Sequence, residues 1–178
     1  MSNITNEPKN KLKLLQTIRG QLEQRAIWLA LLSQEAERKG LDISEFGQES
    51  INQCGIMQGK DLAQGSKDLR DLRKRLFSNG ARMVFEMDLL ESTEDKLSLN
   101  FHYCHLVKGW QKMGLSDEEI ARFCDTAMCG DHAIARQFGA ELHLGKVIAK
   151  GAPICELRFV KEKKTENNRK PLKNKNCF

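Results

Sequence analysis

The first third of the chain alternates apolar and polar residues with the period of an α-helix. Residues 9–39 carry no proline or turn signal, and Gly40 follows the basic end "ERK". This pattern predicts one long amphipathic helix that stops at Gly40. Its apolar residues recur at helical spacing and form the expected buried stripe: Leu15, Ile18, Leu22, Leu29, Leu32 and Ala36.

Beyond Gly40 the helical pattern is interrupted and then changes. A short helix is expected at 43–53, the two glycines of "CGIMQG" predict a break, and a second long helix over 60–78 ends at "SNG". From residue 83 the period becomes two. The runs "RMVFEMDLL" and "KLSLNFHY" alternate apolar and polar residues on either side of the polar "ESTEDK". This arrangement predicts a β-hairpin.

The C-terminal half returns to helices and then to strands. Residues 104–113 have helical spacing, and "SDEE" supplies a capping box for a helix over 116–138. The segments "ELHLGKVIA" and "ICELRFVK" predict two further strands. This order predicts an α+β fold, in which an antiparallel sheet of the hairpin and two C-terminal strands is covered by several helices.

The positive charge of the chain is confined to its last segment. The formal net charge is +5, and residues 161–178 hold seven Lys or Arg against two Glu, so the remainder is formally neutral. A charged segment without apolar periodicity is expected to be disordered. We therefore predict one domain over 1–160 and a basic disordered tail over 161–178. The tail serves solubility, and nucleic acid is not an expected partner.

Apolar runs and cysteine spacing bear on location. The longest apolar run, "AIWLALL", is far shorter than the roughly 20 residues needed to span a bilayer, so no membrane segment is expected. It has none of the flanking features of an export signal. The 6 cysteines are too widely spaced for a small disulfide scaffold. These features predict a cytoplasmic protein with reduced thiols.

Asp131 is out of place on the predicted helix over 116–138. At about 100° per residue it falls in line with Ile120 and Phe138, in the middle of the apolar stripe. A buried carboxylate without a partner is costly, so Asp131 must be paired, hydrogen-bonded or line a cavity. Cys124 lies on the same stripe, and Cys129 lies on the opposite face. A carboxylate that caps a neighbouring loop is the plainer alternative to a functional one.

The stretch "NFHYCHLVKGW" places the Cys104 thiol between two imidazoles. If Cys104 begins a helix, the dipole and the free N–H groups favour its thiolate, and His102 or His105 could act as base. A buried structural cysteine is the alternative. Farther along, Cys155 shares one face of a predicted strand with Leu157, so it is expected to point into the core.

No cofactor is expected. The chain has no CxxC, HxxxH or HExxH pattern. A zinc or iron site that combines distant cysteines is the weaker alternative, because no spacing in the sequence supports it. Its ligands would be Cys104, Cys124 and Cys155.

Three segments together resemble the core of the L-2-amino-thiazoline-4-carboxylic acid hydrolase family. They are "FHYCHLVKGWQKMGLSDEEIARFCD", "GD" at 130–131 and "FGAELHLGKVIAKGAPICELRF", and the resemblance covers about residues 80–160. The shared order is Tyr-Cys, Trp and Gly, a Cys, Gly-Asp, then Cys-Glu-x-x-Phe. The chain departs from the family twice: His105 stands where proline is usual, and Ala152 replaces an aspartate.

The resemblance implies a hydrolase that opens a cyclic isothiourea with water to give N-carbamoyl-L-cysteine. It implies Cys104 as nucleophile, Asp131 as the carboxylate that holds the amidine nitrogens, and His102 or His105 as acid/base. A carboxylate that activates water without a covalent step is equally simple. The departures point to a divergent member that acts on another small molecule. Four residues would line the substrate site: Tyr103, Trp110, Cys124 and Cys155.

Two functions other than hydrolysis fit the same features. One is a non-catalytic small-molecule or metal sensor that uses the same cysteines. The other is an interaction protein in which residues 9–39 form a homodimer surface. For the hydrolase, we expect Cys104, Cys124, Asp131 and Cys155 to meet around one pocket between the sheet and the 116–138 helix.

Overall fold

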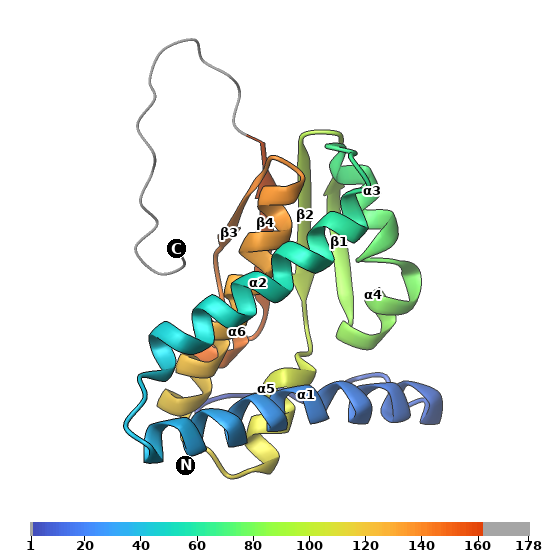
Figure 1. The fold of residues 1–178 in the computed structure, drawn as a ribbon. Helices are drawn as coiled ribbons and strands as arrows, with labels where there is room; N and C mark the ends of the chain where they lie inside the picture. The colour runs from blue at the N-terminus through green and yellow to red at the C-terminus, as the bar shows by residue number, and fades with distance from the viewer. Residues whose placement is uncertain (1, 162–178) are drawn as a thin grey trace.

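The α+β fold class is confirmed by the structure, a computed structural model that describes residues 2–161 except for the side chains of residues 43–45 (Figure 1). The predicted tail lies outside the described residues from residue 162 onward. Six α-helices, four strands and one 3₁₀ turn are formed by the described part of the chain: α1 (Lys13–Arg38), α2 (Ile43–Ala63), α3 (Leu69–Arg75), α4 (Asn79–Phe85), β1 (Met87–Ser92), β2 (Lys96–Phe101), α5 (His105–Lys112), α6 (Asp117–Gln137), β3 (Glu141–Leu144), η1 (Ile148–Lys150) and β4 (Cys155–Val160).

The strands form an antiparallel sheet in the order β1-β2-β4-β3. The hairpin of β1 and β2 is present as predicted, and β4 pairs with β2 so that Leu97 faces Phe159 and Leu99 faces Leu157. These four side chains are buried, because alternate residues of each strand point to the same face. The sheet therefore has one apolar face available for helices.

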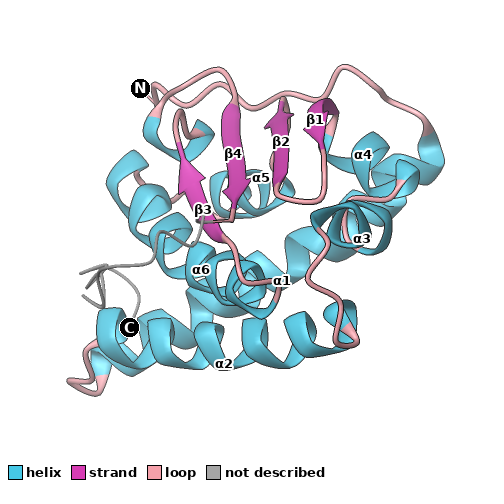
Figure 2. Ribbon diagram, turned by 90° about the horizontal axis from the view of Figure 1, so that it is seen from above, coloured by secondary structure: helices cyan, strands magenta, loops and turns pink. Residues whose placement is uncertain are grey.

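Helix α6 lies between the sheet and α2 (Figure 2). The predicted break in "CGIMQG" is wrong, because α2 runs unbroken through it. Gly55 lies against Gly130 of α6, and a Cβ at Gly55 would fall 2.3 Å from the Gly130 carbonyl oxygen. The glycine marks a close helix–helix contact and not a helix end. Since α2 covers the second face of α6, Cys129 is also fully buried and not on an open face.

The segment between α2 and the hairpin differs from the prediction. The helix expected over 60–78 is divided between the end of α2 and α3, and Ser78 begins α4 by accepting a hydrogen bond from the Ala81 N–H. Met83 and Phe85 belong to α4, so β1 starts only at Met87. A run as short as residues 82–87 fits both the helical and the alternating period. The pattern alone therefore assigned Met83 and Phe85 to a strand. The strand expected at 141–149 ends at Leu144, and η1 follows.

The buried face of α1 is rotated from the predicted one, although Leu15 of the predicted stripe is buried as expected. Ala26 and Ala30 point into the fold, where α1 packs on α5. Gly109 of α5 approaches so closely that a Cβ there would fall 2.8 Å from the Glu23 carbonyl oxygen. Ile18 and Leu32 of the predicted stripe are consequently exposed. Small residues and partnered polar ones, rather than large apolar ones, form this contact.

Two apolar clusters make up the core. One joins the inner face of the sheet to α2, α3 and α6, and the other joins α1, α5, α6 and η1. Cys155 packs against both clusters. Across residues 2–161 no helix combines the length and apolarity needed to cross a bilayer.

Candidate functional site

Cys104 is the N-cap residue of α5, as the sequence predicted. Its backbone is held on both sides by Asn6: the Asn6 side-chain amide donates to the Cys104 carbonyl oxygen (2.8 Å), and the Cys104 N–H donates to Asn6 Oδ1 (2.9 Å). Asn6 is buried. The segment before α1 therefore fixes the position of Cys104. Nothing in the sequence pointed to Asn6, because no motif joins the two positions.

The Cys104 sulfur is protonated at neutral pH. Burial raises the pKa of this thiol, and it outweighs the opposing effect of the Leu106 and Val107 N–H groups at the start of α5. The negative charge of Asp131 raises the pKa further. The expected thiolate at the helix N-terminus is therefore wrong, because the loss of solvation outweighs the helix dipole.

Electrostatic effects on pKa connect four of the residues that the sequence singled out: Cys104, Cys124, Asp131 and Cys155. Burial raises the pKa of Cys124 well above its ordinary value, and Cys104 and Cys155 raise it further. Burial and then Cys104 raise the pKa of Cys155 to about 12, while the Ile148 N–H donates to its sulfur at 3.2 Å. The charge of Asp131 also acts on Cys104, and Cys104, Cys124 and Cys155 all adjoin the apolar cluster of α1, α5, α6 and η1. That the four side chains meet around one pocket stays a prediction.

Asp131 is the titratable acid of this neighbourhood. Burial raises the pKa of its carboxyl to about 6, and the positive charge of Arg25 on α1 opposes that shift. Asp131, Cys104 and Cys155 nevertheless keep partial solvent exposure. A carboxyl that titrates near neutral pH can accept and return a proton under ordinary conditions. No pattern in the sequence pointed to Arg25, because it lies on the solvent side of α1.

The side chains of His102 and His105 lie in surroundings that differ from those of the Cys104 thiol. The buried His105 ring packs against Phe85 with 4.3 Å between centroids and 59° between the ring planes, and its Nδ1 atom has no hydrogen-bond partner among the described residues. Burial, with the cations Arg25 and Arg19, lowers the pKa of His105 to about 3. The ring is therefore neutral at pH 7, and nothing in this geometry supports an acid/base role for it.

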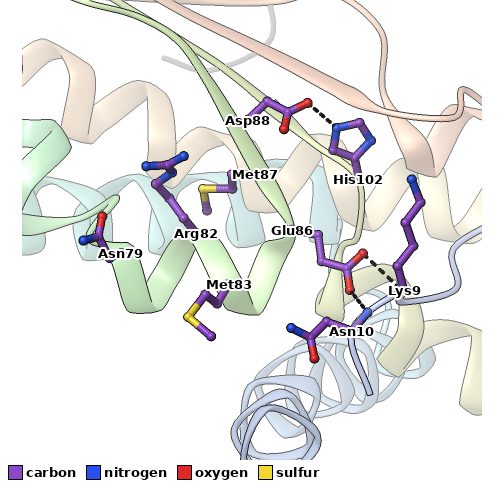
Figure 3. A pocket seen from close by; sticks show the side chains of 9 residues that line it. All are labelled: Lys9, Asn10, Asn79, Arg82, Met83, Glu86, Met87, Asp88 and His102. Atoms are coloured by element: carbon purple, nitrogen blue, oxygen red, sulfur yellow. Dashed lines mark hydrogen bonds and ion pairs between the residues drawn. The ribbon is translucent and has the colours of Figure 1, made fainter. Parts of the chain in front are cut away.

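His102 lies instead in an open polar pocket of about 590 Å³ beside α4 and β1 (Figure 3). Its Nε2 is 2.7 Å from Asp88 Oδ2. In the same pocket, Glu86 accepts hydrogen bonds from the Lys9 and Asn10 N–H groups. None of Cys104, Cys124, Asp131 and Cys155 lines this pocket. His102 is thus separated from the cysteines, and a direct acid/base role in their chemistry stays a prediction.

Tyr103 and Trp110 join α5 to α1. The Tyr103 hydroxyl donates to Glu23 (3.4 Å), and its ring lies under the Arg19 guanidinium. Trp110 Nε1 donates to the Ala26 carbonyl oxygen at 2.9 Å. Both rings are buried. These contacts are structural, and the substrate contacts expected of the two residues stay predictions.

The alternative metal site has no geometric support. Within residues 2–161 there is no group of three or more His, Cys, Asp or Glu side chains arranged to hold an ion. Cys104, Cys124 and Cys155 are therefore neighbours without forming a ligand set.

The raised pKa values predict the order in which thiols are alkylated. At pH 7.5 iodoacetamide should modify the exposed Cys54 first, while Cys104, Cys124 and Cys155 react at least about tenfold more slowly, because attack needs the thiolate. Peptide mass spectrometry at timed intervals measures this order. Guanidinium-unfolded protein is the control and should lose the difference. A folded protein in which Cys104 reacts first would contradict the assignment.

Comparisons with known proteins bear on the family of this chain and on its fold. The family model of L-2-amino-thiazoline-4-carboxylic acid hydrolase matches residues 19–159. No curated protein matches the chain. Among solved structures, a trafficking protein particle complex subunit 3 from Naegleria fowleri, covalently bound to palmitic acid, is similar in fold with a TM-score of 0.52. That match has 11% sequence identity and covers 79% of this chain and 95% of the other. The chain belongs to the L-2-amino-thiazoline-4-carboxylic acid hydrolase family.

Proposed function

We propose that this protein hydrolyses a small cyclic isothiourea or amidine at the group formed by Cys104, Cys124, Asp131 and Cys155. The observation that carries the proposal is the electrostatic action of the Asp131 carboxyl, whose pKa burial raises to about 6, on the protonated Cys104 thiol at the start of α5. The membership of the family favours the same reaction class. A purely structural role would not require an acid to be kept at the edge of a cluster of thiols.

The first step is attack on the amidine carbon. Because Cys104 is protonated at rest, Asp131 takes the thiol proton as the sulfur attacks. A bond forms between the Cys104 sulfur and the ring carbon, and the bond from that carbon to the ring sulfur breaks. The proton passes from Asp131 to the leaving ring sulfur. The product of this step is an open chain attached to Cys104 as an isothiourea.

The second step restores the enzyme. Asp131 is again ionised and accepts a proton from water, whose oxygen adds to the same carbon. The bond to the Cys104 sulfur breaks, Asp131 returns its proton to that sulfur, the second proton of the water moves to the imine nitrogen, and an N-carbamoyl product leaves. One water molecule is consumed in the whole cycle. Direct attack by water on the ring, with Asp131 as base, requires the same carboxyl and leaves Cys104 unmodified.

Arg25 gives this site a second point of recognition. Its positive charge acts on Asp131 from α1, and it has no ion pair among the described residues. A substrate that carries both an amidine and a carboxylate would place the first on Asp131 and the second toward Arg25. His105 and Ala152, the departures from the family pattern, favour a substrate that differs from the thiazoline in the rest of the ring.

The test is turnover by the full chain of 2-amino-thiazoline-4-carboxylate and of a panel of cyclic isothioureas and amidines that differ in the rest of the ring, with the N-carbamoyl product measured by mass spectrometry. Wild-type protein should turn over, and Cys104→Ser should lose on the order of 10²-fold or more in kcat/KM, because a hydroxyl is a far weaker nucleophile at this site. A trapped adduct of one substrate mass on Cys104 separates the covalent route from direct attack by water.

Cys54→Ser is the matched control, since Cys54 is exposed on α2 and away from the site. It should retain wild-type turnover. Failure of the protein to turn over the thiazoline and a panel of cyclic amidines, with binding retained, would replace hydrolysis by the non-catalytic sensor function.

A further inference from the structure

An apolar stripe remains uncovered along the outer face of α1. Leu14, Trp28 and Leu32 are 71%, 69% and 69% exposed, and Ile18 is 37% exposed. At about 100° per residue these positions lie within roughly 40° of one line, well away from the face that Ala26 and Ala30 bury. Figure 1 shows α1 running along one edge of the molecule beside α5. A contiguous exposed stripe of this kind marks an interaction surface.

The stripe is symmetric about its own centre. Leu14 and Leu32 are equally distant from Glu23, and so are Ile18 and Trp28. If a second α1 lies antiparallel on the first about this centre, each apolar residue meets an apolar residue of the other copy. A two-fold interface requires this property, because residue i must contact j while j contacts i.

The charges at the two ends of α1 follow the same order. Lys11 lies just before the start of α1, as many residues before Glu23 as Glu35 lies after it, so the antiparallel arrangement brings the Lys11 end of each helix near the Glu35 end of the other copy. Among the described residues Lys11 has no ion pair, and Glu35 pairs only with Arg38 of the same helix and with the C-cap residue Lys39. A parallel arrangement would instead bring like charges together at both ends, which is unfavourable.

We propose that the outer face of α1 binds a second copy of this chain as an antiparallel helix pair centred near Glu23. The occupant is the same chain because both the apolar positions and the charges are complementary to themselves. Buried Glu23 points into the fold and leaves the seam to Leu14, Ile18, Trp28 and Leu32. The proposal stands independently of the hydrolase function.

The first test is sedimentation velocity of the full chain. Wild-type protein should sediment as a dimer at micromolar concentration, and Leu14→Glu should weaken dimerisation on the order of 100-fold, since two buried charges enter each symmetric interface. Met57→Glu is the matched control, because Met57 is 70% exposed on α2, outside the stripe. A monomeric wild type, or a Leu14→Glu variant that dimerises normally, would overturn the proposal.

The second test fixes the direction of the helices. Leu14→Cys and Leu32→Cys proteins are mixed and treated with a short bis-maleimide, and cross-linked peptides are identified by mass spectrometry. The antiparallel pair predicts a link from position 14 to position 32 and little linkage of either variant to itself. Links of position 14 to itself would refute the arrangement. Circular dichroism of each variant verifies that it is folded.

Discussion

Asp131→Asn should produce a protein that is more stable than the wild type at pH 7.5 and inactive as a hydrolase. Burial raises the pKa of Asp131 from 3.8 to about 6, so the folded state disfavours the charge that the carboxyl carries at neutral pH. Asparagine has a similar shape without that charge. Its introduction should therefore raise the free energy of unfolding by up to about 3 kcal/mol.

The pH dependence of the gain has a definite sign. Between about pH 4 and 6 the folded state retains a proton on Asp131 that the unfolded chain has lost, so wild-type stability falls as pH rises through this window. The variant lacks this titration. Urea unfolding should therefore show no difference between the two proteins below pH 4 and the full difference above pH 6.

Asp125→Asn is the matched control on the same helix. Asp125 is exposed and paired with Lys150 at 2.8 Å, so its replacement should change stability by less than about 1 kcal/mol at either pH. In the activity assay Asp131→Asn should lose about 10²- to 10⁴-fold in kcat, because no other acid within residues 2–161 acts on Cys104. Loss of stability at pH 7.5 would mean that Asp131 is a structural acid with an essential partner.

Local structural features were predicted correctly from the sequence where residues close together in the chain determine them. The capping box of Ser116 and Glu119 is present, and Cys104 begins α5 as expected. The position of Asp131 on the apolar stripe of α6 correctly indicated that its carboxyl is half-buried, and this burial raises its pKa. Each of these features depends on a spacing of a few residues, which one sequence is sufficient to read.

Contacts between distant segments could not be predicted in this way. The hydrogen bonds of Asn6 to Cys104 and the field of Arg25 on Asp131 join parts of the chain with no shared period. Periodicity also misplaced the buried face of α1, because Arg19 enters the core with its charge paired to Glu86. The buried face of α1 is mostly small or polar, apart from Leu15, and its outer face carries large apolar residues. This departs from the usual distribution and is the basis of the proposed dimer.

Gly55, which the sequence predicted to be part of a helix break, is the position where substitution should cost the most stability. Gly55→Ala should destabilise the protein by about 3 kcal/mol or more, because its Cβ would meet the backbone of Gly130, which cannot move aside as a side chain can. The helices α2 and α6 would have to separate, and Asp131, the next residue of α6, would shift with them. Thermal unfolding by circular dichroism measures the loss.

Substitutions at two other glycines provide comparisons for the stability loss of Gly55→Ala. At Gly59 a Cβ would meet mainly the flexible Gln137 side chain, so Gly59→Ala should cost less than Gly55→Ala. Gly20 lies within α1 with no atom within 4 Å of an added Cβ, so Gly20→Ala should stabilise by about 0.5–1 kcal/mol through helix propensity alone. Equal effects at positions 55 and 20 would show that α2 and α6 are not in backbone contact. The predicted order of stability losses, largest at Gly55, would instead show that the contact of Gly55 with Gly130 fixes the spacing of α2 and α6. This contact thereby fixes how far Asp131 is buried.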